Sequence, residues 1–295
     1  MIDPKTTILP AENVPDDIEW LGAQPGPVIA YGGDVPGADV VVADIDAALV
    51  LEQRIRSWPI TATVLVQVLR SIERLPFQQA LDLESLAYAT LQGGPEFAAW
   101  LRQRDESPLS APPTGEAVLL SRDGAVVEAV LNRAADRNPI SVEMRDALVE
   151  ALSLLEADDS ITELRLRGDG ACFSIGGDLR EFGTLPNPGT AHWVRTVQSP
   201  ARLLAKLGAR VTAHVHGACI GSGLELPAFA ARVVAHRNTF FQMPELQLGL
   251  IPGAGGTLSI TRRIGRQRLA WLVLSGRRIN TRTALAWGLV DEVVH

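Results

Sequence analysis

Two glycine-rich turns and two glutamates occur in a fixed order between residues 172 and 257, and this order constrains the chain more than any other feature. The four segments are Cys-Phe-Ser-Ile-Gly-Gly-Asp at 172–178, Gly-Ser-Gly-Leu-Glu at 221–225, Met-Pro-Glu at 243–245 and Gly-Ala-Gly-Gly-Thr at 253–257. Each glycine turn can aim a backbone N–H group at a carbonyl oxygen, and a nearby carboxylate can move a proton. Such a set can stabilise negative charge that appears only during a reaction, and it can make a thioester enolate.

The composition is that of a folded globular protein with little attraction for nucleic acid. The 295 residues are 46% hydrophobic, which is enough for a sizeable core in one large α/β domain or two smaller ones. The formal net charge is −7 and basic runs are few, so a phosphate backbone is a poor partner.

No segment predicts a membrane span, an export signal or a metal site. Apolar stretches stay short of about 20 residues and the N-terminus lacks a signal pattern, so we expect a cytoplasmic protein that does not enter a membrane. Cys172 and Cys219 have no partner at metal-ligand spacing and are expected to be reduced and packed. His214 and His216 alternate on a predicted strand without a third ligand, so we expect no bound metal.

The second half of the sequence repeats the order strand, turn, helix. A hairpin is predicted around Asp123-Gly124, a helix from Ser141, and strands at 163–168, 211–216 and 233–236. Such repeats favour parallel strands wrapped by helices, which is an α/β fold.

The two glutamates stand in different surroundings. Glu225 follows Ser222 by three residues, so a helical turn would bring both to a similar side, and regular helix should begin close to Pro227. Glu245 lies in an apolar segment where burial should raise its pKa. Taken alone, each glycine turn could be an ordinary tight turn, and a buried glutamate could be an ion-pair partner. Residues 253–257 predict the start of a helix rather than a phosphate loop, because no Walker lysine follows.

The first third of the chain lacks these motifs and predicts mainly helices. Apolar residues between 60 and 102 recur at helical spacing, with Pro76 opening one helix and Gly93-Gly94-Pro95 closing it. Residues 1–38 predict an irregular arm that could include one strand. This arm could cover a sheet edge, reach a neighbouring subunit or pack loosely on its own domain.

These motifs together resemble the crotonase superfamily, which is the enoyl-CoA hydratase and isomerase group. The resemblance covers 117–295 and includes Val-Leu-Asn-Arg-Ala-Ala-Asp-Arg-Asn-Pro-Ile at 130–140, together with the glycine and glutamate segments. It implies a crotonase-like spiral of β-β-α units with a helical lobe. It also implies that the amides of Gly177 and Ser222 form an oxyanion hole, and that Glu225 and Glu245 are catalytic. Asp178 is expected to cap a following helix.

The resemblance implies a binding site for CoA, which is part of the thioester substrate rather than a separate cofactor. The implied binding residues are Arg137, Ser174, Gly176, Gly177, Asp178, Leu179, Arg180 and Ser222. Val66 stands where many members have a lysine that would contact phosphate.

The helical lobe that family members carry after the core is expected here before it. Residues 40–58 resemble the first helix of that lobe, so we predict a circular permutation. The predicted division is 1–38 as arm, 39–105 as lobe, 106–116 as linker and 117–295 as catalytic core. The alternative is an unrelated helical domain before a truncated core.

The resulting functional prediction is hydration of a 2-enoyl-CoA. Isomerisation or another CoA-enolate reaction is the nearest alternative, because this superfamily changes chemistry by changing one or two acids. A non-catalytic subunit that binds acyl-CoA or serves assembly is a second alternative. The resemblance also implies a homotrimer or hexamer, in which a neighbour could close the pocket.

Overall fold

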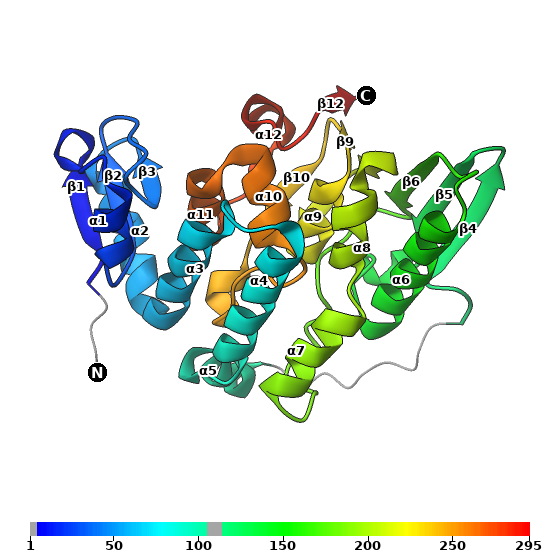
Figure 1. The fold of residues 1–295 in the computed structure, drawn as a ribbon, viewed down its shortest axis with the longest axis horizontal. Helices are drawn as coiled ribbons and strands as arrows, with labels where there is room; N and C mark the ends of the chain where they lie inside the picture. The colour runs from blue at the N-terminus through cyan, green and yellow to red at the C-terminus, as the bar shows by residue number, and fades with distance from the viewer. Residues whose placement is uncertain (1–4, 105–113) are drawn as a thin grey trace.

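The computed structural model describes residues 5–104 and 114–295, which form three regions (Figure 1). We refer to residues 5–42 as the N-terminal unit, 45–103 as the helical lobe and 117–295 as the core. Residues 106–113 of the predicted linker lie outside the described residues.

The N-terminal unit is a small folded layer rather than an irregular arm. Three short parallel strands form a sheet in the order β1-β2-β3, with a helix between the first two: β1 (Thr7–Pro10), α1 (Ile18–Ala23), β2 (Val28–Tyr31) and β3 (Val40–Val42). Val28 and Ala30 face a separate apolar cluster with Leu21, whereas Ile29 faces the main core. This alternation is the period of a strand, but runs of three or four residues are too short to stand out in a sequence.

Strand β3 also corrects the predicted start of the lobe. The segment 40–58 resembles a helix throughout, yet helix α2 (Ile45–Ser57) begins only after Asp44, whose side chain accepts a hydrogen bond from Ala47 N at 2.9 Å. The preceding valines pair with β2 instead, because a β-branched run fits a half-buried strand.

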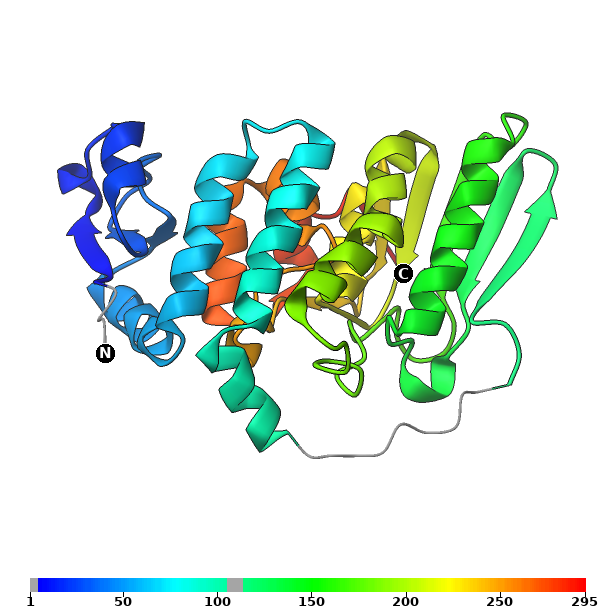
Figure 2. The same cartoon turned by 60° about the horizontal axis from the view of Figure 1, so that its bottom comes forward.

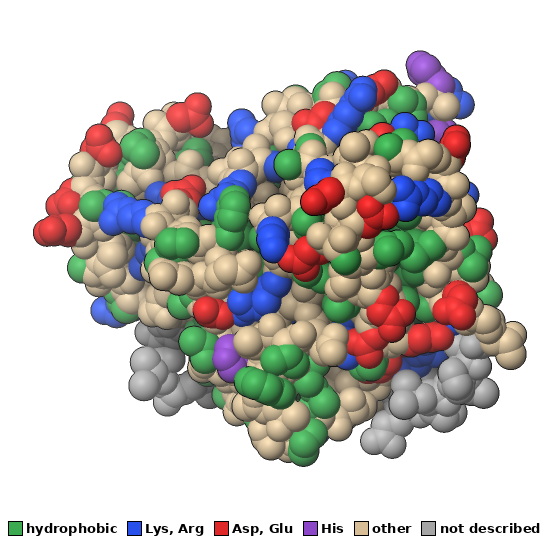
Figure 3. Space-filling view, turned by 45° about the vertical axis from the view of Figure 1, so that its right-hand side comes forward, with side chains coloured by type: hydrophobic (Ala, Val, Ile, Leu, Met, Phe, Trp, Pro, Cys, Tyr) green, Lys and Arg blue, Asp and Glu red, His purple; other side chains and the backbone are tan. Residues whose placement is uncertain are grey.

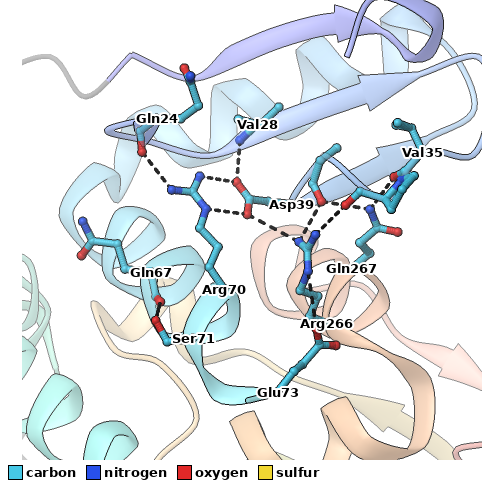
Figure 4. A network of polar contacts seen from close by, with 12 residues as sticks. Gln24, Val28, Val35, Asp39, Gln67, Arg70, Ser71, Glu73, Arg266 and Gln267 are labelled. Atoms are coloured by element: carbon cyan, nitrogen blue, oxygen red, sulfur yellow. Dashed lines mark hydrogen bonds and ion pairs between the residues drawn. The ribbon is translucent and has the colours of Figure 1, made fainter. Parts of the chain in front are cut away.

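A buried ion pair fastens the N-terminal unit to the rest of the chain (Figure 4). Asp39 accepts hydrogen bonds from Arg70 Nε at 2.9 Å and Nη2 at 2.6 Å, and from Val28 N at 2.9 Å. Arg266 of the core donates to Ala38 O at 2.8 Å and lies 3.7 Å from Asp39. Asp39 is only 2% exposed, so this carboxylate depends on the two arginines.

The helical lobe contains the predicted helices and packs directly on the core. After α2 come α3 (Pro59–Ile72), α4 (Phe77–Gln92) and α5 (Pro95–Gln103). Pro59 and Pro95 occupy first-turn positions, where a missing N–H costs nothing. Leu65 and Leu69 belong to the same buried cluster as Leu258 and Leu272 of the core, so lobe and core share one hydrophobic interior.

A six-stranded sheet forms one side of the core, in the order β12-β9-β7-β6-β5-β4. It opens with the predicted hairpin, which turns at Gly124, and all its other pairings are parallel. The strands are β4 (Val118–Asp123), β5 (Val126–Leu131), β6 (Glu163–Gly168), β7 (Val211–Val215), β9 (Arg232–His236) and β12 (Glu292–Val294).

A second, three-stranded sheet and the core helices complete the fold. The small sheet has the order β11-β10-β8, and α3, α4, α8 and α6 lie alongside one another (Figure 2). The remaining elements of the core are α6 (Val142–Ala157), α7 (Pro188–Val197), α8 (Pro200–Leu207), β8 (Ala218–Ile220), α9 (Ser222–Glu225), β10 (Phe240–Gln242), α10 (Gly256–Ile264), α11 (Arg266–Ser275), β11 (Ile279–Asn280) and α12 (Thr281–Trp287). In the described part of the chain, no helix has the length and apolar character needed to cross a membrane.

Candidate active site

The two glycine turns of the core lie against each other. Ser174 forms an isolated bridge with Cys219, and Ile220 N donates to Ser174 O at 3.2 Å. Gly176 has φ 92°, and a Cβ on it would lie 2.6 Å from Ile220 O. Only glycine allows this backbone conformation and this close approach, so the turns can meet.

Two backbone N–H groups at this junction are uncommitted. Among the described residues, neither Gly177 N nor Ser222 N has a hydrogen-bond acceptor. The Ser222 hydroxyl, which is buried, also has no partner there. Buried donors are normally paired, so this cluster indicates a place for a ligand oxygen.

Two details of the turns differ from the sequence predictions. Helix α9 is a single turn that ends at Glu225, and Pro227 starts a 3₁₀ turn, so no regular helix begins near the proline. Asp178 caps no helix, because residues 179–183 form turns. Its carboxylate instead accepts from Arg180 N at 3.0 Å and pairs with the Arg180 guanidinium at 2.6 Å.

Glu225 is held by the turn that starts helix α10. Its Oε2 accepts hydrogen bonds from Ala254 N at 2.7 Å and Gly256 N at 2.8 Å. Gly256 must be glycine for this contact, because a Cβ there would lie 2.5 Å from Glu225 Cγ. The helix start predicted at residues 253–257 is confirmed, and the structure adds that this turn orients a carboxylate.

Glu245 reaches the glycine junction from the other side. A Cβ on Gly221 would lie 2.8 Å from Glu245 Oε1, which places this carboxyl group beside the second turn. Glu245 is 7% exposed, and its Oε2 has no hydrogen-bond partner among the described residues. This oxygen is therefore available to a substrate.

A third buried carboxylate, Glu84 of helix α4, was missed by the sequence prediction. It is 2% exposed and accepts from Gly255 N at 2.7 Å, from Thr257 N at 2.9 Å and from Thr257 Oγ1 at 2.6 Å. The turn thus alternates its donors, with 254 and 256 serving Glu225 and 255 and 257 serving Glu84. A glutamate on the apolar face of α4, between Ala80 and Leu91, was the signal that could have found it.

Burial raises the pKa of all three carboxyl groups. Desolvation is the largest cause at each, and it raises the pKa of Glu84 to about 7 and that of Glu245 to about 8. The pKa of Glu225 is raised well above its ordinary value by desolvation and then by the charges of Glu84 and Glu245. The raised pKa predicted for Glu245 is confirmed.

The glycine junction and two of these glutamates line one cavity of about 670 Å³. Gly176, Gly177, Leu179, Ser222, Glu225 and Glu245 are among its lining residues. A larger cavity of about 850 Å³ lies between the N-terminal unit and helices α11 and α12, but it contains none of these groups. The smaller cavity is therefore the candidate active site.

Four of the residues implied for CoA binding lie outside this lining: Arg137, Ser174, Asp178 and Arg180. They support the first turn instead. Ser174 Oγ accepts from Gly176 N at 3.1 Å, and Arg137 O accepts from Ile175 N at 3.2 Å. Their role toward CoA stays a prediction.

The two cysteines lie in the core, next to the glycine turns. Cys172 and Cys219 are buried free thiols, as predicted. No group of three or more potential metal ligands occurs in residues 5–104 and 114–295.

Comparisons with known proteins identify the family of the chain. Residues 121–295, more than half of the chain, match the family described as Enoyl-CoA hydratase/isomerase. The chain is 35% identical over 176 residues to the 2,3-dehydroadipyl-CoA hydratase of Escherichia coli K12, covering 60% of this chain and 68% of the relative. It is 36% identical over 183 residues to the 1,2-epoxyphenylacetyl-CoA isomerase of the same strain, covering 61% and 70%.

A solved structure leads to the same family. An enoyl-CoA hydratase from Mycobacterium smegmatis superposes with a TM-score of 0.56 at 30% identity, covering 61% of this chain and 70% of that one. The fold is the α/β crotonase fold. The chain belongs to the enoyl-CoA hydratase/isomerase family, whose members act on acyl-CoA thioesters.

Proposed function

We propose that this protein is an enoyl-CoA hydratase, which adds water across the double bond of a 2-enoyl-CoA thioester. The observation that carries the proposal is the presence of two buried glutamates beside two uncommitted backbone N–H groups in one cavity. The N–H groups of Gly177 and Ser222 would bind the thioester oxygen, on which negative charge develops during addition. One such donor is typically worth about 2.7–4 kcal/mol of activation free energy.

The glutamates divide the proton transfers. Glu225 accepts a proton from the attacking water, whose oxygen bonds to the β carbon, and the electrons of the double bond move toward the thioester oxygen. Glu245, whose pKa burial raises to about 8 and whose Oε2 has no partner among the described residues, then protonates the α carbon. The orientation of Glu225 by Ala254 N and Gly256 N supports its role as the group that positions water.

A spectrophotometric assay tests the proposal. Wild-type protein mixed with crotonyl-CoA should consume the absorbance of the conjugated thioester. Glu245→Gln should abolish turnover while leaving CoA-thioester binding nearly intact, because the amide keeps the size of the carboxyl group but cannot give up its proton. Full activity of this variant would remove Glu245 from the mechanism.

Isomerisation is the second candidate, and the 36% identity to an epoxyphenylacetyl-CoA isomerase favours keeping it. Glu225→Gln separates the two reactions, because water addition needs a base for the water and an acid for the α carbon, whereas a proton shift can use a single group that accepts and returns the proton. Loss of hydration with retained isomerisation of a 3-enoyl-CoA would assign the water to Glu225. No turnover with several enoyl-CoAs would favour a non-catalytic acyl-CoA-binding or assembly subunit.

We further propose that the helical lobe is the family's C-terminal lobe, placed before the core by circular permutation. The contacts of α3 and α4 with α10 and α11, and the entry of Glu84 into the site, support this. About 30% of the Mycobacterium smegmatis hydratase lies outside the match, which leaves room for such a lobe.

A homotrimer or hexamer stays a prediction, as does a cytoplasmic location. Hydrophobic side chains gather near the lower edge of the face in Figure 3, whereas acidic and basic ones are interspersed above them. Trp193 and Val197 of α7 are 64% and 48% exposed and would suit a subunit contact. Light scattering after size exclusion would give the oligomeric state.

A further inference from the structure

An arginine of helix α7 lies in the wall of the active-site cavity next to helix α4. Arg195 is half-buried, lines the cavity, and stacks on Tyr88 with its guanidinium carbon 4.4 Å from the ring centroid. Tyr88 in turn packs under Gly253, where a Cβ would lie 2.4 Å from the ring. The cation is therefore part of the rigid wall next to the turn that holds Glu225.

The guanidinium has only neutral hydrogen-bond partners. Nε donates to Ser85 Oγ at 3.1 Å, Nη1 to Gln92 Oε1 at 3.1 Å and Nη2 to Ser85 O at 3.4 Å. A guanidinium carries five N–H groups, so one on each terminal nitrogen remains. In the described part of the chain, no carboxylate lies within 4.0 Å of Arg195. Glu84 is on the same helix as Tyr88, but its two oxygens are engaged by Gly255 and Thr257.

Neighbouring contacts fix the orientation of the Arg195 guanidinium. Ser85 Oγ accepts from Arg195 and has a single proton, so it donates that proton to His192 Nδ1, at 2.9 Å. Another arginine of the cavity wall, Arg145, differs because it pairs with Asp146 at 2.7 Å. Arg195 is thus a preorganised cation that no carboxylate contacts among the described residues, and Glu84 attracts it only through space. A ligand anion that reached the free N–H groups would therefore stabilise it.

Arg195 makes no side-chain hydrogen bond to the loop that the resemblance implies for CoA binding. That loop, 174–180, is joined to Arg137 and Ile140 by backbone hydrogen bonds, whereas the side-chain hydrogen bonds of Arg195 all go to helix α4. If the CoA part of a thioester held at Gly177 and Ser222 lies along that loop, as the resemblance implies, its acyl part would extend toward the wall that contains Arg195.

We propose that Arg195 binds a carboxylate at the far end of the acyl chain, so that the preferred substrates are enoyl-CoA thioesters of dicarboxylic acids. This inference rests on the proposed function, because it assumes that an acyl-CoA occupies the cavity. A carboxylate matches the planar fork of a guanidinium, and the stack on Tyr88 holds the fork in place.

Two thioesters of equal length test the inference. One is 2-hexenoyl-CoA, and the other carries a carboxylate in place of its terminal methyl group. Wild-type protein should show kcat/KM at least about tenfold higher for the carboxylated thioester, as expected for a charge-assisted hydrogen-bond pair. Arg195→Met should lose that advantage by lowering activity on the carboxylated thioester about 10- to 100-fold, with little change for 2-hexenoyl-CoA. Arg145→Met is the matched control and should leave the preference intact.

Equilibrium binding separates this inference from the proposed reaction. Titration with the two saturated six-carbon thioesters should give tighter binding of the carboxylated one to wild-type protein and to Arg195→Lys, but not to Arg195→Met. If neither enoyl thioester reacts while this binding difference persists, hydration is wrong and the anion site stands. If wild-type protein handles the neutral thioester equally well or better, in turnover and binding, the anion site is overturned.

Discussion

At the scale of single residues, the site depends on one short turn that serves two carboxylates. Glu84 fixes Gly255 and Thr257, and the N–H groups between them orient Glu225. Replacing Glu84 by Gln leaves one acceptor oxygen where two are needed, so the turn should shift. Because misplacement of a catalytic group by about 1 Å can cost about 100-fold, we expect kcat to fall by about 10- to 100-fold.

The pH profile distinguishes this effect from simple loss of stability. The charge of Glu84 is the largest electrostatic contribution, after desolvation, to the raised pKa of Glu225. Removing that charge should move the acid limb of kcat/KM to lower pH, and Glu84→Asp should restore the limb in part. Glu150→Gln, an exposed change on helix α6, is the control. If the acid limb of kcat/KM in Glu84→Gln keeps its wild-type position, Glu84 has only a packing role.

The buried carboxyl groups also make stability depend on pH. The pKa of Glu245 rises from 4.5 to about 8 in the folded protein, so the folded state binds more protons than the unfolded state between these values. The free energy of unfolding therefore falls as pH rises through this window, by at most about 1.4 kcal/mol per pH unit for one group. Urea unfolding should show that the free energy of unfolding of Glu245→Gln, relative to that of wild type, is higher at pH 8 than at pH 5. An equal change in the free energy of unfolding between pH 5 and pH 8 in the two proteins would contradict the prediction.

Site residues that stand within a local sequence motif could be predicted from the sequence. Glu225 and Glu245 stand in segments that resemble motifs of the family, so their place beside the glycine turns could be predicted before the fold was known. Their catalytic roles stay a proposal. Glu84 could not be placed in the same way, because its partners Gly255 and Thr257 lie about 170 positions away in the chain. The same holds for Arg195, whose partners lie on another helix.

At the scale of elements, long periodic helices and the hairpin could be predicted, and short strands could not. Helices α3 and α4 have clear apolar faces, and Gly124 marks the hairpin turn. Strands β1 to β3 have three or four residues each and depend on one another for pairing. Local sequence carries little of that information, because a strand is stabilised by its neighbours.

The docking of those strands makes the next prediction. Asp39→Asn leaves the buried Arg70 without its anion and leaves Arg266 with Glu73 alone, at 3.9 Å. Removing one partner of a buried ion pair typically costs about 3–5 kcal/mol. We expect urea unfolding to report a loss of this size. Asp44→Asn is the matched control, because asparagine also caps a helix, here α2. Equal stability of the two variants would mean that the N-terminal unit is held by its apolar contacts alone.

At the scale of the whole molecule, we expect the position of the lobe in space to matter more than its position in the chain. Apolar residues of α3 and α4 share one interior with α10 and α11, and Glu84 acts across that interface. A protein reordered as residues 114–295, a long flexible linker and residues 5–104 keeps all of these contacts. It should therefore fold and retain hydration activity of the same order of magnitude as wild type.

The matched comparison is the core alone. Residues 114–295 without the lobe would expose the apolar faces of α10 and α11 and leave Gly255 N and Thr257 N without Glu84. Circular dichroism and the crotonyl-CoA assay should find this fragment poorly folded and inactive, while the reordered protein resembles wild type. A core that folds and reacts alone would make the lobe an accessory, and a reordered protein that fails to fold would show that the chain order itself is required. Either result would contradict a permuted lobe that completes the site from any position in the sequence.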